Sequence, residues 1–132
     1  PRPRDYVPGG SIIVIIATDA PLIATQCKRL AQRATVGLAR VGGNGYNASG
    51  DLFMAFATGN ELKPDGKPVL TLEMLQHHHI NSLFDAVADA TEESILNALT
   101  AAETMIGYQG RIVHALPLDE LQRVMRRYRP AD

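Results

Sequence analysis

Tryptophan is absent from this sequence, and cysteine occurs only once. A single cysteine excludes an internal disulfide and a metal site built from several thiolates. No apolar run approaches the roughly 18 residues of a membrane-spanning helix, so we expect no membrane segment. Aromatic residues make up 5% of the chain and the net charge is -1, so neither base stacking nor a basic surface suggests a nucleic-acid partner.

The composition that remains is typical of one globular domain: 132 residues, 45% hydrophobic and 20% charged. The first ten residues, PRPRDYVPGG, lack the apolar centre of a secretory signal. We expect residues 1–10 to be a linker that ends a preceding segment, and residues 11–132 to belong to a single domain. We also expect a cytoplasmic protein.

Two strands with a helix between them are predicted in the first half of the chain. The run IIVII within residues 11–18 predicts a strand buried on both faces. Apolar residues at spacings of three and four predict a helix over 21–41, with Asp19 as its N-cap. Alternation in SGDLFMAFAT predicts a second strand over 49–58. This order is a crossover unit, which joins parallel strands.

The second half is predicted to be mainly helical. Residues 69–75 fit either a strand or the start of a helix, and the pattern leaves this open. A helix is predicted over 80–106, ended by Gly107, with a weaker apolar stripe near Ala90–Thr91 where it could break. A short strand at 111–114 and a helix from Pro117 to Tyr128 complete the chain.

Several segments resemble ligand sites, but their context favours simpler interpretations. The glycine-rich GGNGYNASG precedes a strand, whereas a phosphate-binding loop leads into a helix. The run His77–His79 cannot point at one metal ion as a set, and no second ligand motif accompanies it, so we expect no metal and no cofactor. We expect the basic side of the first helix, Lys28–Arg33, to be solvated, and Cys27 to be a small core residue.

The most unusual feature is a group of polar residues at the start of both predicted strands. Parallel neighbours begin at the same edge of a sheet, so Ser11 should lie near Ser49 and Asp51. Ser49 and Asp51 share one strand face, which we expect to direct both towards Ser11. These residues could simply be caps or turn residues, or they could form a site. A site at the amino ends also differs from open doubly wound sheets, which bind ligands at the carboxyl ends.

A serine nucleophile requires a base, and no histidine lies near Ser11 in the sequence. Cutting the Gly10–Ser11 bond would release the α-amine of Ser11 itself. A free α-amine has a pKa of about 7.7–8.0, so it can accept a proton near neutral pH. The Gly-Gly pair before Ser11 would allow the strained backbone that an N-to-O acyl shift requires. We therefore predict self-cleavage between Gly10 and Ser11.

Three motifs in order, GGSIIVIIATDAPL, NASGDLFMAFATGN and DATEESILNALTAAETMIGYQG, resemble the self-processing L-aminopeptidase/D-esterase and β-peptidyl aminopeptidase family. The resemblance covers residues 9–121. It implies a precursor that cleaves itself into an α chain and a smaller β chain, with this sequence as the β chain preceded by the tail of the α chain. The implied fold is α/β: an αββα four-layer sandwich resembling N-terminal-nucleophile hydrolases with different connectivity, completed by the separate α chain and typically assembled into tetramers.

The resemblance also implies roles for the residues at the strand edge. Ser11 would be the nucleophile and carry the amine base, while Ser49 and Asp51 would orient it. Some members have Glu where this chain has Asp51, which is one methylene shorter. The implied activity is hydrolysis of N-terminal aminoacyl peptides, amides or esters through an acyl-enzyme. The oxyanion-stabilising asparagine and most of the substrate pocket belong to the α chain, so selectivity cannot be assigned from this chain.

Two alternatives to the aminopeptidase remain open at the sequence level. A related acyltransferase of the ornithine acetyltransferase type shares the fold and the self-cleavage, but such enzymes generally have threonine where this chain has Ser11. A non-catalytic subunit of the same fold would never cleave itself. An uncut Gly10–Ser11 bond would favour that second alternative.

Overall fold

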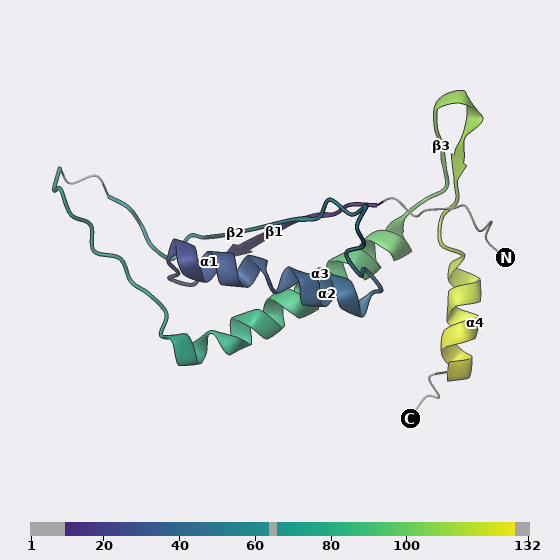
Figure 1. Cartoon of the computed structure of the whole chain (residues 1–132). Helices are drawn as coiled ribbons and strands as arrows, with labels where there is room; N and C mark the ends of the chain where they lie inside the picture. The colour runs from purple at the N-terminus through teal and green to yellow at the C-terminus, as the bar shows by residue number, and fades with distance from the viewer. Residues whose placement is uncertain (1–9, 64–65, 129–132) are drawn as a thin grey trace. The chain divides into compact units, whose positions relative to one another are not determined.

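The computed structural model describes residues 10–63 and 66–128 (Figure 1). Within it the chain divides into two compact units, with the boundary between Glu92 and Glu93. Most of the predicted linker, residues 1–9, lies outside the described residues. The single-domain organisation of residues 11–132 stays a prediction.

The first unit contains a two-stranded parallel sheet. Strand β1 spans Ile13–Thr18 and β2 spans Leu52–Ala57, in a register that runs from Ile13 beside Leu52 to Thr18 beside Ala57. The predicted crossover unit is confirmed, and both strands begin two or three residues later than the sequence pattern suggested. Because the strands are parallel, their amino ends lie at the same edge of the sheet.

The two faces of this sheet differ in exposure. Helices cover the face formed by Val14, Ile16, Phe53, Ala55 and Ala57. The opposite face is apolar and open in this chain, with 47% to 69% exposure at Ile13, Ile15, Leu52, Met54 and Phe56. The prediction that the first strand is buried on both faces is therefore wrong for this chain by itself, because the helices of the first unit pack on one side of the sheet.

Two helices follow β1 where one was predicted. Helix α1 spans Ala24–Ala31 and α2 spans Ala34–Arg40. The Thr35 hydroxyl donates to the carbonyl of Gln32 at 2.7 Å, a local bond that competes with a continuous helix at this turn. The N-cap is Ile23 rather than Asp19, so the helix also begins later than predicted.

Helix α3 spans Asn81–Ala101 without a break, and a 3₁₀ turn at His77–His79 leads into it. The predicted weak point at Ala90–Thr91 does not interrupt the helix. Thr91 is buried, and its hydroxyl donates to the carbonyl of Val87 at 2.7 Å, so its polar atom is satisfied within the helix. The core that these elements enclose consists of Leu22, Leu30, Ala34, Ile80, Phe84 and Val87, with Cys27 partly buried against it as predicted.

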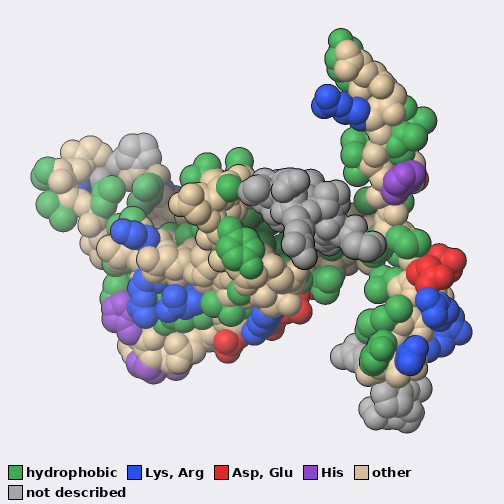
Figure 2. Space-filling model, turned by 45° about the vertical axis from the view of Figure 1, so that its right-hand side comes forward, with side chains coloured by type: hydrophobic (Ala, Val, Ile, Leu, Met, Phe, Trp, Pro, Cys, Tyr) green, Lys and Arg blue, Asp and Glu red, His purple; other side chains and the backbone are tan. Residues whose placement is uncertain are grey.

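We predicted that the basic residues Lys28–Arg33 are solvated. Lys28 is exposed as predicted, but Arg29 of α1 and Arg33, the N-cap of α2, pack against α3. The guanidinium groups of Arg29 and Arg33 lie 5.1 and 4.2 Å from the centre of the Phe84 ring. The Nη1 atom of Arg29 also lies 3.1 Å from Nδ1 of His77. Lysine, arginine and histidine side chains accordingly lie side by side on this unit (Figure 2). Cation–π contacts thus give these arginines a packing role.

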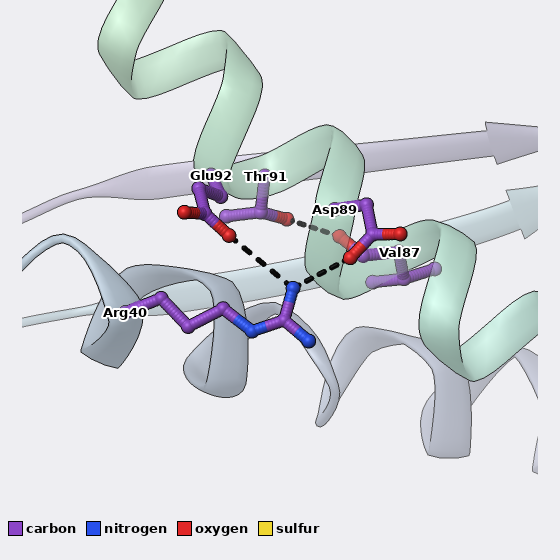
Figure 3. A network of polar contacts seen from close by, with 5 residues as sticks. All are labelled: Arg40, Val87, Asp89, Thr91 and Glu92. Carbon is purple, nitrogen blue, oxygen red and sulfur yellow. Dashed lines mark hydrogen bonds and ion pairs between the residues drawn. The ribbon is translucent and has the colours of Figure 1, made fainter. Parts of the chain in front are cut away.

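Helices α2 and α3 also contact each other through an ion pair (Figure 3). One guanidinium nitrogen of Arg40 lies 2.5 Å from a carboxylate oxygen of Asp89 and 3.2 Å from one of Glu92. The hydrogen bonds from Arg40 to Asp89 and then to Glu92 raise the pKa of the guanidinium above its ordinary value. The group therefore stays charged wherever the protein is folded, although an exposed pair contributes little to stability.

Beside this ion pair the two helices approach closely at Gly37. A Cβ atom at this position would lie 2.4 Å from the carbonyl oxygen of Ala88 and 2.7 Å from Cβ of Thr91. The clash with Ala88 involves backbone, which cannot rotate away. Glycine at position 37 is therefore what allows α2 to pack against α3.

The segment between β2 and α3 has no regular strand or helix at 69–75, the stretch that the sequence left open. Side chains fix its ends. Asn60 donates to the carbonyl of Glu73 at 2.9 Å and accepts from its N–H at 2.8 Å. The fully buried Gln26 donates to the carbonyl of Leu75 at 2.7 Å, which joins this segment to α1.

The second unit contains the hairpin of β3 (Met105–Ile106) and β4 (Ile112–Val113), followed by helix α4 (Leu118–Tyr128). The predicted strand and last helix are confirmed within a few residues. We predicted that Gly107 ends the preceding helix, but α3 already ends at Ala101. Gly107 instead begins the hairpin turn, where its N–H donates to the carbonyl oxygen of Arg111 at 2.7 Å. Among the described helices, none combines the length and apolar character that crossing a membrane requires.

We predict that Gly37→Ala destabilises the full-length protein by about 1–3 kcal/mol, because the added methyl group overpacks the α2–α3 contact. The sign of the stability change distinguishes the two effects, since Gly→Ala in an unhindered helix is stabilising by roughly 0.5–1 kcal/mol. The exposed Ala39→Gly on the same helix serves as a control that changes helix propensity alone. Thermal unfolding measures both, and a raised melting temperature for Gly37→Ala would contradict the packing argument.

Candidate active site

The amino edge of the sheet brings together the two segments in which the sequence predicted a site. Leu52 N–H donates to the carbonyl of Ile12 at 2.9 Å, which extends the pairing beyond the start of β1. Continued towards the N-terminus, the register of Ile13 with Leu52 sets Ile12 beside Asp51 and Ser11 beside Gly50. The prediction that these segments meet at one edge is confirmed.

The carboxylate of Asp51 binds two donors from the two strands. Its Oδ1 atom accepts from the backbone N–H of Ile12 at 3.2 Å and from the hydroxyl of Ser49 at 2.6 Å. Both bonds are partly buried, where a charge-assisted hydrogen bond is stronger than it would be in water. Asp51 thereby holds the backbone directly after Ser11 and fixes the Ser49 side chain.

The hydroxyl of Ser49 has two acceptors within reach but only one proton. Its oxygen is 2.6 Å from Asp51 Oδ1 and 3.0 Å from the carbonyl oxygen of Gly10. It can therefore donate to one acceptor at a time. The backbone N–H of Ser49 donates to the carbonyl of Tyr46 at 2.7 Å, and this turn fixes where the side chain starts.

The hydroxyl of Ser11 lies on the other side of the strand pair. Its oxygen accepts from the backbone N–H of Gly50 at 2.9 Å. Side chains alternate along a strand, so Ser11 follows the open face while Asp51 and Ser49 follow the covered face. The expectation that Ser49 and Asp51 point at the Ser11 side chain is thus corrected: they contact the backbone on either side of it, Gly10 O and Ile12 N–H.

Gly50 is the contact residue that the sequence interpretation missed. The signal was present, because a parallel register that sets Leu52 beside Ile13 also sets Gly50 beside Ser11. Only the register could reveal it, since a backbone N–H leaves no trace in the residue type. The site is therefore made of three side chains and two backbone donors, the N–H groups of Ile12 and Gly50, at the start of the two strands.

The histidines are not part of this group. His77–His79 form a 3₁₀ turn, with His77 beside Arg29, and His114 lies in the second unit. Within residues 10–63 and 66–128, no three His, Cys, Asp or Glu side chains lie close enough together to hold a metal ion.

Comparisons with known protein sequences yield a family match and close relatives. The family model described as Peptidase family S58 matches residues 3–113. Beta-peptidyl aminopeptidase BapA of Sphingosinicella microcystinivorans is 44% identical over 121 residues, which make up 91% of this chain and 31% of that protein. The chain thus spans about a third of the length of the curated relatives that it matches.

Solved structures show the same relationship. The PH0078 protein from Pyrococcus horikoshii OT3 is 52% identical, with a TM-score of 0.85 over 91% of this chain and 34% of that one. The L-aminopeptidase D-Ala-esterase/amidase from Ochrobactrum anthropi is 40% identical, with a TM-score of 0.83 over 95% of this chain and 36% of that one. The latter structure is described as a prototype for the serine aminopeptidases and a new variant among the Ntn hydrolase fold. The predicted fold class, α/β of the N-terminal-nucleophile type, is confirmed.

Proposed function

Because this chain belongs to peptidase family S58, as its three motifs predicted, we propose that its full-length protein is a self-cleaving serine aminopeptidase. The protein cuts itself between Gly10 and Ser11 and then uses Ser11 to hydrolyse N-terminal aminoacyl peptides, amides or esters. One observation carries the proposal: at the amino edge of the sheet Ser49 reaches the Gly10 carbonyl oxygen, Asp51 binds the Ile12 N–H, and these two contacts lie on either side of Ser11. The names of the relatives, which include aminopeptidases, support the same activity.

Self-cleavage begins when Ser11 Oγ attacks the carbonyl carbon of Gly10. The carbon–nitrogen bond breaks, the nitrogen gains the hydroxyl proton, and Gly10 becomes esterified to Ser11 Oγ. Water then hydrolyses this ester, which leaves a carboxylate on Gly10 and a free α-amine on Ser11. Ser49 lies 3.0 Å from the Gly10 carbonyl oxygen, where negative charge develops during the attack, and a donor there stabilises it.

Turnover of substrate uses the same atoms. The free α-amine of Ser11 accepts the hydroxyl proton as Oγ attacks the substrate carbonyl. The bond from the acyl carbon to the amine or alcohol then breaks, the departing group takes up that proton, and the acyl group stays on Ser11 Oγ. Water then hydrolyses the acyl-enzyme. Asp51 holds Ile12 N–H and Ser49 Oγ, so it fixes both the backbone that carries the nucleophile and the hydroxyl beside the amine.

The open face of the sheet supports a second part of the proposal. Five large apolar side chains of β1 and β2 are exposed on that face, which is the arrangement expected of a sheet that packs on another layer. We infer that the α chain of the same precursor covers it and completes the αββα sandwich. Assembly of these αβ units into a homo-oligomer, a tetramer by resemblance to the family, belongs to the same proposal.

Ser11→Ala should leave the full-length precursor uncut and inactive, because the substitution removes the attacking oxygen. Intact mass under denaturing conditions and N-terminal sequencing report the cut. Ser82→Ala is the control, since it removes an exposed hydroxyl that donates to His79 away from the sheet edge. A second chain that still began at residue 11 in the Ser11→Ala protein would sink the proposal.

Asp51→Asn should lower turnover on the order of 10²-fold or more, because it removes the charge that holds the backbone directly after Ser11 and the hydroxyl of Ser49. Ser49→Ala should also slow hydrolysis while largely preserving the fold. Release of p-nitroaniline from an aminoacyl p-nitroanilide measures both. The control is Asp89→Asn, which removes a carboxylate that binds Arg40 on the helices. Equal rates for wild type and Asp51→Asn would refute the assignment.

The pH profile should show an acidic limb around pH 6–8, because the Ser11 amine must lose its proton before it can accept one. An anion nearby favours the protonated amine and raises its pKa, so Asp51→Asn should move this limb to lower pH. Activity should also survive chelators, because the amine replaces a metal. Loss of activity in EDTA with recovery on adding zinc would contradict the amine mechanism.

A further inference from the structure

Gly50 stands between the two polar side chains of the site but faces the opposite way. Ser49 and Asp51 follow the covered face of the sheet, and the alternation of the strand turns position 50 towards the open face. There its backbone N–H donates to Ser11 Oγ at 2.9 Å. Position 50 is therefore the neighbour of the nucleophile itself, whereas Ser49 and Asp51 contact the adjacent backbone.

Backbone conformation does not explain why this residue is glycine. Four glycines among the described residues have positive φ, namely Gly42, Gly45, Gly66 and Gly110, and Gly50 is not among them. The available space does explain it. A Cβ atom on residue 50 would lie 3.2 Å from Ser11 Oγ and 4.0 Å from Ser11 Cβ, with no other group within 4 Å. Among the described residues, and apart from its two chain neighbours, the atom that a side chain at position 50 would crowd is the nucleophilic oxygen.

We propose that Gly50 is a positioning residue for Ser11, acting through its N–H and through the absence of a side chain. The N–H donates to one lone pair of Oγ, which leaves the hydroxyl proton free to go to the base. The empty space beside Oγ accommodates the acyl carbon that bonds to this oxygen in both self-cleavage and turnover. This inference rests on the proposed function and adds a residue that selects the working rotamer of the nucleophile.

The consequence of a methyl group at position 50 follows from the freedom of the serine side chain. Ser11 has one side-chain torsion, and its staggered wells are about 120° apart. A contact of 3.2 Å is relieved when Oγ shifts by a few tenths of an ångström or leaves its well, and either movement lengthens or breaks the bond to Gly50 N–H. The bonds that Asp51 Oδ1 accepts from Ile12 N–H and from the Ser49 hydroxyl do not involve Ser11 Oγ, so they remain.

The test is Gly50→Ala in the full-length precursor. We expect slower self-cleavage by intact mass, and a fall in kcat on the order of 10²-fold with KM little changed, since a displaced nucleophile slows chemistry rather than binding. The acidic limb of the pH profile should stay at the wild-type pH, because Asp51 keeps its contacts. General damage to the sheet edge would move that limb or KM, and either result would overturn the positioning role.

Gly107→Ala is the matched control. Gly107 also has negative φ, and the nearest atom to its added Cβ would be Arg111 O at an ordinary 3.6 Å. The Gly107→Ala precursor should cleave itself and hydrolyse substrate at the wild-type rates. If wild type neither cleaves itself nor hydrolyses aminoacyl substrates, the proposed function fails. If wild type does both and Gly50→Ala matches it, only the inference about Gly50 fails.

A comparison that needs no activity keeps the geometric part falsifiable. Ser11→Ala and the double variant Ser11→Ala/Gly50→Ala both lack Oγ, so we expect both to remain uncut. Without Oγ the methyl group on residue 50 meets Cβ of residue 11 at an ordinary 4.0 Å, so the double variant should melt at the same temperature as Ser11→Ala or slightly higher, because Gly→Ala lowers the entropy of the unfolded chain. A lower melting temperature for the double variant would show that another group opposes the methyl, and the proposal would be overturned.

Discussion

The parallel register of β1 with β2 is the constraint on which the candidate site depends. It aligns Ile13 with Leu52, and this alignment sets Gly50 beside Ser11 and Asp51 beside Ile12. A slip of one residue would turn every side chain of one strand to the other face. Asp51 would then leave the Ile12 N–H, and the Ser11 hydroxyl would meet a side chain in place of the Gly50 backbone. The chemistry at the edge therefore depends on pairing along the whole sheet.

That register is fixed by packing at some distance from the edge. Apolar side chains of both strands pack against the helices on one face of the sheet. A slip of one residue would turn the apolar side chains of one strand away from the helices, so this packing opposes the slip. The helices in turn hold one another through the close approach at Gly37, the Arg40 ion pair and the arginines over Phe84. Polar side chains anchor the connection, with Gln26 bound to Leu75 O. A change that disrupts the close packing at Gly37 would therefore weaken the support of this register, whereas the exposed Arg40 ion pair contributes little to it.

The fold was predictable wherever a local pattern decides the structure. The β-branched run before Thr18 and the alternation before Ala57 located both strands, and the crossover order gave their parallel pairing. Predictions failed where the hydrogen bond of one polar side chain accompanies the end or the continuation of a helix. Such hydroxyl bonds follow no repeating pattern in the sequence. Thr35 binds Gln32 O where one helix becomes two, while Thr91 binds Val87 O within a helix that continues. The same residue type thus accompanies opposite outcomes.

By itself, the sequence determined which residues meet at the amino edge, because the crossover and the strand periods bring Ser11, Ser49 and Asp51 there whatever the details of packing. It also determined the family, through three motifs in order. Only the tertiary structure decided which way each group points. It directs Asp51 and Ser49 to the backbone on either side of Ser11, leaves the Ser11 hydroxyl to Gly50, and opens one sheet face that the residue pattern had suggested was buried. The physical reason is that the face to which a side chain points depends on the strand register and on the side where the helices pack. Both are set by contacts between residues about 40 positions apart.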